Sequence, residues 1–133
     1  LSLLSSYTLY NYSDKVVKQL QKSHRKELST ADKSNLKRII KEIEYYRNIN
    51  LHYPKNLTEI IEFNRKINPD GLINFNDNDS RGYRIYYRLI NANSYELFSV
   101  GEDGKPHTED DILTDLALTE INNTGLANYN LIK

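Results

Sequence analysis

The densest group of chemically useful side chains lies in residues 99–112, where two glycines and a proline interrupt a run of acidic residues. The carboxylates of this segment belong to Glu102, Asp103, Glu109, Asp110 and Asp111. Carboxylates held this close repel one another, and a hard divalent cation that takes about six to eight oxygen ligands relieves the repulsion. The segment therefore predicts a Ca²⁺ site. On composition alone a solvated acidic turn is the commoner explanation, because acidic loops are more frequent than metal loops.

The order of residues in this segment resembles the calcium loop that closes the globular domain of major pseudopilins of type II secretion systems. The similarity lies in Ser-Val-Gly-Glu-Asp-Gly-Lys-Pro at 99–106, followed by Asp-Asp-Ile at 110–112. Upstream, an apolar helix pattern over 39–46, the Tyr53-Pro54 dipeptide and a short helix pattern over 57–63 follow the order found in that family.

The resemblance implies a set of calcium ligands within the loop. The implied ligands are Val100, Lys105, Thr108, Asp110 and Asp111. The two aspartates would bind through carboxylates, the valine and the lysine through main-chain carbonyls, and the threonine would add a further oxygen. Asp103 either binds the ion or holds the turn through an Asx-type hydrogen bond, and the sequence leaves both open. The ion would be structural rather than catalytic.

The resemblance also implies a role in assembly. We expect a structural subunit or membrane-anchored ectodomain of a type II secretion or type IV pilus-like system, located in the periplasm or at the cell surface. Its expected partners are other pilin-like or secretion-system subunits. Residues 5–50 carry too many charges to span a bilayer, so membrane contact is expected only through a segment upstream of Leu1. The chain departs from the family at two places. It has Arg81 where the family has Trp, and Ile-Leu-Thr-Asp at 112–115 where the family closes with Ile-Gly-Asn-Trp.

Helices are expected to dominate the first half of the chain. Residues 1–50 contain neither Pro nor Gly, and the strongest apolar stripe spans 36–46. The apolar rhythm lapses at 29–32, which predicts a break or kink there. A second, short helix is expected to begin at a capping box formed by Asn56 and Glu59.

The second half predicts a small antiparallel sheet. Residues 83–90 have the composition of a strand, and 91–94 would turn the chain into a hairpin. The expected register pairs Ile90 with Tyr95, Tyr87 with Phe98, and Ile85 with Val100. The tail from Leu113 is ambiguous between strand and helix. The expected fold is therefore α+β and pilin-like, with a long N-terminal helix packed on a short helix and a small sheet. Residues 1–35 would form a helical arm and residues 36–133 the globular domain.

Charge and aromatic content suggest an alternative function. Thirteen basic and seven acidic residues give +6 over 1–66, whereas five basic and eleven acidic residues give −6 over 67–133. Arg84, Tyr86 and Arg88 would share the outer face of the hairpin, and a strand that mixes cations with rings is typical of nucleic-acid or polysaccharide binding. A half-buried hairpin with an amphipathic outer face is the commoner explanation, because the net charge is zero. The leading interpretation includes no nucleic acid.

The sequence gives little support for catalysis. There is no Cys, and the three histidines are scattered without the spacing of a zinc site. Ser99, His107 and Asp110 have the composition of a catalytic triad, but they lie in one loop without the glycine pattern of a nucleophile elbow. We therefore expect a protein that is not an enzyme.

Overall fold

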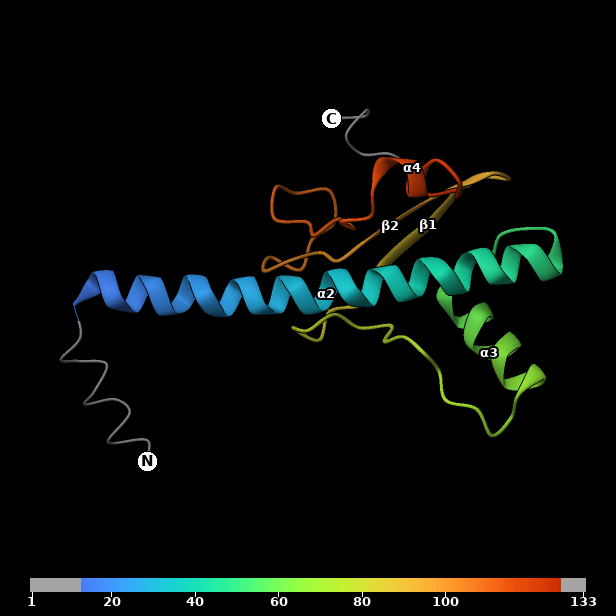
Figure 1. Ribbon diagram of the computed structural model, residues 1–133, viewed down its shortest axis with the longest axis horizontal. Coiled ribbons are helices and arrows are strands. Elements are labelled where there is room, and N and C mark those ends of the chain that lie inside the picture. Colours follow the sequence, from blue (N-terminus) through green and yellow to red (C-terminus); the bar gives the residue numbers. More distant parts are fainter. Residues whose placement is uncertain (1–12, 128–133) are drawn as a thin grey trace.

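The computed structural model describes residues 13–127, and its longest element is a single helix of 37 residues, α2 (Asp14–Asn50) (Figure 1). The Ser13 side chain caps the helix by accepting a hydrogen bond from a backbone N–H of the first turn. The helix ends at Leu51, whose φ of 64° is left-handed. The predicted long helix is confirmed for these residues, and the part predicted over 1–12 lies outside the described residues.

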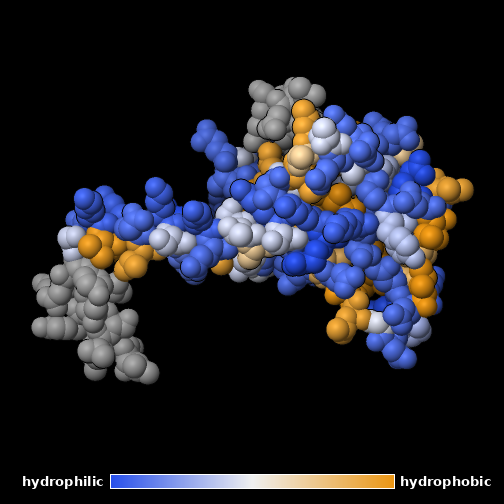
Figure 2. Space-filling model, in the orientation of Figure 1, coloured by the Kyte–Doolittle hydropathy of each residue, from blue (hydrophilic) through white to orange (hydrophobic). Residues whose placement is uncertain are grey.

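Only the second half of α2 is buried. Its buried apolar residues are Leu36, Ile39, Ile40, Ile43 and Tyr46. Residues 14–31, here called the projecting half, extend beyond the globular part and carry a largely hydrophilic surface (Figures 1 and 2). Within it, Val16 and Leu20 remain 41% and 51% exposed. Because burial of one large apolar side chain contributes about 1.5–3 kcal/mol, the second half anchors the helix. The proposed domain boundary at residue 35 falls inside this continuous helix.

The helix continues through residues 29–32, so the predicted break there is wrong. The apolar rhythm lapses because Asp32 and Asn35 occupy buried positions on the face of α2 that packs inward. The Asp32 carboxylate accepts hydrogen bonds from the Ser80 N–H (2.7 Å) and from the Ser80 hydroxyl (2.8 Å). The Asn35 side chain donates to the Asn76 carbonyl (2.7 Å) and accepts from the Asn76 N–H (2.8 Å). These polar groups dock the segment 76–80 onto the helix instead of ending the helix.

The second helix, α3 (Leu57–Ile67), begins where the sequence predicts. The Asn56 side chain accepts a hydrogen bond from the Glu59 N–H (2.9 Å), and the Glu59 carboxylate accepts one from the Lys55 N–H (2.9 Å). The first bond satisfies a backbone donor that a helix start leaves without a partner, and the second ties Lys55, the residue before the N-cap, to the first turn of α3. Leu57 and Ile60 bury the inner face of α3.

The sheet has two antiparallel strands, β1 (Tyr86–Asn91) and β2 (Ser94–Phe98). The predicted hairpin is therefore present, and the structure is α+β, with a long helix and a small antiparallel sheet. The predicted register is wrong by one residue. The observed pairs are Tyr86 with Phe98, Tyr87 with Leu97, Arg88 with Glu96, and Leu89 with Tyr95. An irregularity between Leu89 and Asn91 then shifts the register, so that Asn91 pairs with Ser94.

The corrected register places Phe98 on the outer face of the hairpin instead of facing the helix. Its ring stacks on Tyr86, with ring centroids 4.6 Å apart, and is fully buried. On the same face Arg88 and Glu96 lie opposite each other and form an ion pair. The predicted register would instead have left Glu96 beside the apolar Leu89, so charge pairing and aromatic stacking both favour the observed one.

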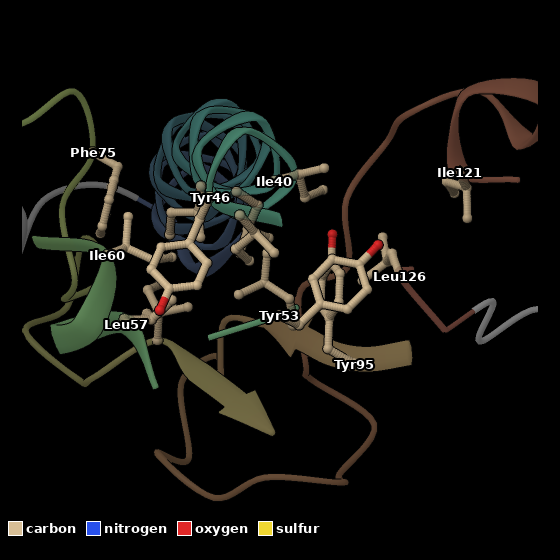
Figure 3. Packing of buried hydrophobic residues seen from close by; sticks show 14 residues of the cluster. Ile40, Tyr46, Tyr53, Leu57, Ile60, Phe75, Tyr95, Ile121 and Leu126 are labelled. Atoms are coloured by element: carbon tan, nitrogen blue, oxygen red, sulfur yellow. The ribbon is translucent and has the colours of Figure 1, made fainter. Parts of the chain in front are cut away.

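The core lies between the buried half of α2, α3 and the inner face of the sheet, and its middle is aromatic (Figure 3). Tyr53 and Tyr95 lie side by side, with ring centroids 5.1 Å apart. Both hydroxyls donate to the Glu44 carboxylate, Tyr53 at 3.0 Å and Tyr95 at 2.9 Å. Burial and the Glu44 charge raise the pKa of Tyr53 to about 12, so the pair stays protonated and keeps donating at neutral pH.

The C-terminal segment is a mixture of the two alternatives that the sequence leaves open. It forms one short helix, α4 (Leu118–Ile121), and then a parallel bridge between Leu126 and Tyr95 of β2. The Gly125 N–H donates to the same Glu44 carboxylate at 3.2 Å. Glu44 therefore joins α2, the sheet and the C-terminal segment.

Candidate metal site

The acidic loop leaves β2 and returns to it at a closed neck. Ser99 and Ile112 exchange two backbone hydrogen bonds, of 3.0 Å and 2.8 Å. The fully buried Ser99 hydroxyl also donates to the Asp79 carboxylate at 2.9 Å. The neck fixes both ends of the loop, so the residues between them form one compact unit at the end of the hairpin.

Oxygen atoms of the loop converge on the Thr108 hydroxyl. Its Oγ1 lies 2.6 Å from Asp110 Oδ1, 3.2 Å from the Lys105 carbonyl oxygen and 3.4 Å from Asp111 Oδ1. One hydroxyl donates a single hydrogen, so it satisfies only one of these three acceptors at a time. Four of the six candidate ligands, Lys105, Thr108, Asp110 and Asp111, are therefore brought together as a cluster of hard oxygen donors.

Asp103 and Val100 are placed differently from those four residues. The Asp103 carboxylate accepts the Lys105 N–H at 2.9 Å, which is the Asx-type turn that the sequence offered as one of two roles. The Asp103 N–H donates to Asp110 Oδ2 at 2.9 Å and so orients that carboxylate. Val100 is buried at the start of the loop, and no hydrogen bond in the described part of the chain joins its carbonyl to the cluster.

Three residues of the loop, Gly101, Gly104 and His107, have positive φ, and the first and last of them determine how the loop closes. At Gly101, with φ 73°, a Cβ atom would lie 2.1 Å from the Asp110 carbonyl oxygen, so the chain requires glycine there. His107, with φ 63°, turns its ring out of the loop and places Nε2 2.9 Å from Glu96 Oε2. The ring also lies edge-on to Phe98, at 5.5 Å between centroids. The loop is thereby held against the outer face of the hairpin.

Electrostatics make the two aspartates unequal. The Thr108 hydroxyl and the Asp103 N–H hold the pKa of Asp110 down at about 2, so Asp110 is ionised at neutral pH. Partial burial raises the pKa of Asp111 above its usual value. An ion beside both carboxylates would favour their charged forms and remove this cost.

The clustered oxygen atoms belong to two carboxylates, one carbonyl and one hydroxyl. Such a set fits a hard cation that accepts carbonyl, hydroxyl and water oxygens in addition to carboxylates. Among residues 13–127, no group of three or more His, Cys, Asp or Glu side chains is arranged to hold a metal ion. Two carboxylates therefore supply all the charge at the cluster. Ca²⁺ accepts such mixed oxygen ligands in a flexible geometry, whereas Zn²⁺ is typically held by nitrogen or sulfur.

The contacts that attach the loop to the rest of the molecule were not predicted from the sequence. Glu102 pairs with Arg25 of the projecting half at 2.8 Å and with Arg81 at 3.6 Å. His107 and Glu96 join the loop to β2. The one available signal was the concentration of basic residues in the first half and acidic residues in the second, which predicts attraction but no particular partners.

The residues of the alternative binding face do not form a uniform platform. Arg88 is paired with Glu96, and Tyr86 is stacked on Phe98. Arg84 is exposed and makes no hydrogen bond or ion pair with any residue that the structure describes. Of the three, only Arg84 keeps a side chain free to bind a ligand.

Comparisons with protein-family models, with curated proteins and with solved structures give no significant match. Within residues 13–127, no helix has the length and apolar character needed to cross a membrane.

Proposed function

We propose that this chain is a pseudopilin-like structural subunit, or the ectodomain of a membrane-anchored one, stabilised by one structural Ca²⁺ in the loop 99–112. The observation that carries the proposal is the convergence of the Lys105 carbonyl, the Thr108 hydroxyl and the carboxylates of Asp110 and Asp111 within 3.4 Å of one atom. A long helix with one buried half and one projecting half supports an assembly role, because the projecting surface is available to a neighbour.

Calcium would act by fixing the loop. Asp110, Asp111 and Lys105 would supply oxygens directly, and Thr108 and the Val100 carbonyl would complete the protein ligands. The ion would replace carboxylate repulsion with attraction and so tie the loop to the neck at the end of β2. Binding to the folded state alone stabilises it by about 2.7 kcal/mol at a ligand concentration one hundred times Kd.

The proposed partners are other pilin-like or secretion-system subunits outside the cytoplasm. The projecting half carries five Lys or Arg residues against two acidic ones, so a neighbour with an acidic face would fit it. In this proposal the chain is not an enzyme and does not bind nucleic acid. Contact with a membrane would come through a segment preceding Leu1.

The test is thermal unfolding with Ca²⁺ and with a chelator. We expect Ca²⁺ at one hundred times Kd to raise Tm by roughly 8–14 °C, at about 3–5 °C per kcal/mol for a chain of this size. Replacing both Asp110 and Asp111 with Ala should abolish the rise while the far-UV helical signal is kept. Glu109→Ala is the matched control, because it removes an exposed carboxylate from between Thr108 and Asp110. Equal melting curves with Ca²⁺ and with chelator would refute the proposal, as would a normal response of the double variant.

A further inference from the structure

A second candidate site lies on the side of the sheet next to the start of α3. It is a cleft of about 530 Å³ between the first turn of α3, the residues leading into β1 and the acidic loop. Its lining includes Asn56, Thr58, Asp77, Tyr83, Arg84 and Pro106. The volume is within the range of about 300–1,000 Å³ that is typical of small-ligand sites.

Two opposite charges in this cleft have no partner within the described part of the chain. The backbone around them is fixed by a bridge between Asn78 and Arg84, in which the Ile85 N–H donates to the Asp77 carbonyl at 2.9 Å. The Asp77 carboxylate and the Arg84 guanidinium make no hydrogen bond or ion pair with another residue in 13–127. By contrast, nearby Arg88 is paired with Glu96. The cleft thus offers an acceptor and a donor on one rigid wall.

An aromatic ring and an apolar floor complete the cleft. Tyr83 is 41% exposed, and one side of its ring lies against Gly104, where a Cβ atom would come within 2.7 Å of the ring. Leu57 and Ile85 are buried beneath the cleft. Tyr83 therefore offers an exposed apolar ring surface beside polar groups.

We propose that this cleft binds a neutral oligosaccharide. Sugar hydroxyls both donate and accept hydrogen bonds, so one hydroxyl can donate to Asp77 while another accepts from Arg84, and the amide of Asn56 and the hydroxyl of Thr58 extend the same chemistry. The C–H face of a sugar ring can lie on Tyr83. A nucleic acid fits less well, because Asp77 repels phosphate and Arg88 is already paired. This inference is independent of the proposed calcium site, although Pro106 belongs to both the loop and the cleft.

The test is titration of the ¹⁵N-labelled chain with maltotetraose, cellotetraose and chitotetraose, followed by backbone amide shifts. Each titration is run with Ca²⁺ and with chelator, so that loss of the metal site is distinguished from loss of the cleft. We expect saturable shifts at Tyr83 and Arg84 with at least one sugar. Arg84→Ala and Asp77→Asn should each weaken binding at least tenfold. The control Arg38→Ala removes an exposed arginine from α2 and should leave binding unchanged.

Three outcomes would overturn the inference. One is the absence of saturable shifts with all three sugars at millimolar concentration. Another is binding that Arg84→Ala and Asp77→Asn leave intact, which would place the sugar elsewhere. The third is preferential binding of a single-stranded dT10 oligonucleotide with the same amides shifting, which would assign the cleft to a phosphate polymer.

Discussion

Asn35 provides the sharpest test of how the fold is held together. Its side-chain amide, only 5% exposed, forms a two-point contact with the backbone of Asn76, 41 residues later in the chain. Asn35→Ala removes both hydrogen bonds and leaves the Asn76 N–H and carbonyl without these partners. The contact docks the segment that leads to Ser80 and then to β1, so its loss should loosen that segment while α2 stays helical.

The expected loss of folding free energy follows from the two hydrogen bonds between Asn35 and Asn76. Each contributes about 0.5–1.5 kcal/mol net, so the pair contributes about 2 kcal/mol. Alanine is a better helix former than asparagine by about half a kcal/mol, and this gain partly masks the loss. Asn48→Ala measures this gain in helix propensity alone, because Asn48 is exposed on α2 and its side chain makes no hydrogen bond with a described residue. We therefore expect Asn35→Ala to be about 2 kcal/mol less stable than Asn48→Ala.

The assay is urea unfolding monitored by circular dichroism, with amide exchange at Asn76 as a local measure. The slope m should be unchanged and the midpoint lowered, and Tm should fall by roughly 6–10 °C relative to the Asn48→Ala control. Asn35→Asp is a useful second variant, because it keeps the shape and the acceptor but loses the donor to the Asn76 carbonyl. A difference between Asn35→Ala and the control below about 0.5 kcal/mol would show that this contact does not dock the segment.

Three further predictions concern the loop and the core. Gly101→Ala should destabilise the chain by more than about 2 kcal/mol in urea unfolding, because a left-handed φ and contact with the Asp110 carbonyl both oppose a Cβ; unchanged stability would contradict the loop geometry. The Thr108 hydroxyl lowers the pKa of Asp110 to about 2. The ionised Asp110 carboxylate therefore contributes to the free energy of unfolding above about pH 4, and this contribution is lost as the pH falls towards 2. The stability difference between the wild type and Asp110→Asn should narrow over that window, and a constant difference would contradict it. Tyr95→Phe removes one buried hydrogen bond to Glu44 and should cost about 1–3 kcal/mol by urea unfolding, whereas a neutral effect would show that Glu44 does not need this donor.

The helices were predictable because their signals are local. The absence of Pro and Gly before residue 51 and the stripe over 36–46 are sufficient to predict the buried half of α2, and the Asn56–Glu59 capping box predicts the start of α3. Asp32 misled the prediction of a break at 29–32 because its partner, Ser80, lies 48 residues later in the chain. A pattern read along the helix contains no information about such partners, so polar residues on the inner face resembled a helix break.

The register of the hairpin could not be derived from alternation. Four consecutive residues of β2, from Tyr95 to Phe98, are buried, because the core covers one face and the loop with Tyr86 covers the other. When both faces of a strand are covered, a shift by one residue still places an apolar side chain on each side. The hydrophobic pattern then no longer distinguishes one register from the other. Opposite charges then provide the better guide, and the pairing of Arg88 with Glu96 agrees with the observed register.

Much of the candidate metal site was predictable because its members lie close together in sequence. Lys105, Thr108, Asp110 and Asp111, which the family resemblance implies as ligands, meet within a single turn-rich loop, so their closeness in sequence keeps their oxygens near one another. The attachment of the loop through His107 and Glu96 is a tertiary contact that depends on the register of the hairpin. Any error in register therefore hides the residues that orient the site.

The projecting half of α2 is the surface on which the proposed assembly role depends. A helix of this length is marginal in isolation, but here the packed half supplies the nucleus and the projecting half only has to propagate it. Lys15, Lys18, Lys22 and Lys26 follow one another at spacings of three and four residues, which places like charges side by side on one face. Each such pair weakens the helix by about 0.2–0.5 kcal/mol, so this composition does not serve the stability of the free chain. In the proposed assembly, an acidic neighbour lying along that face would remove the repulsion and gain attraction.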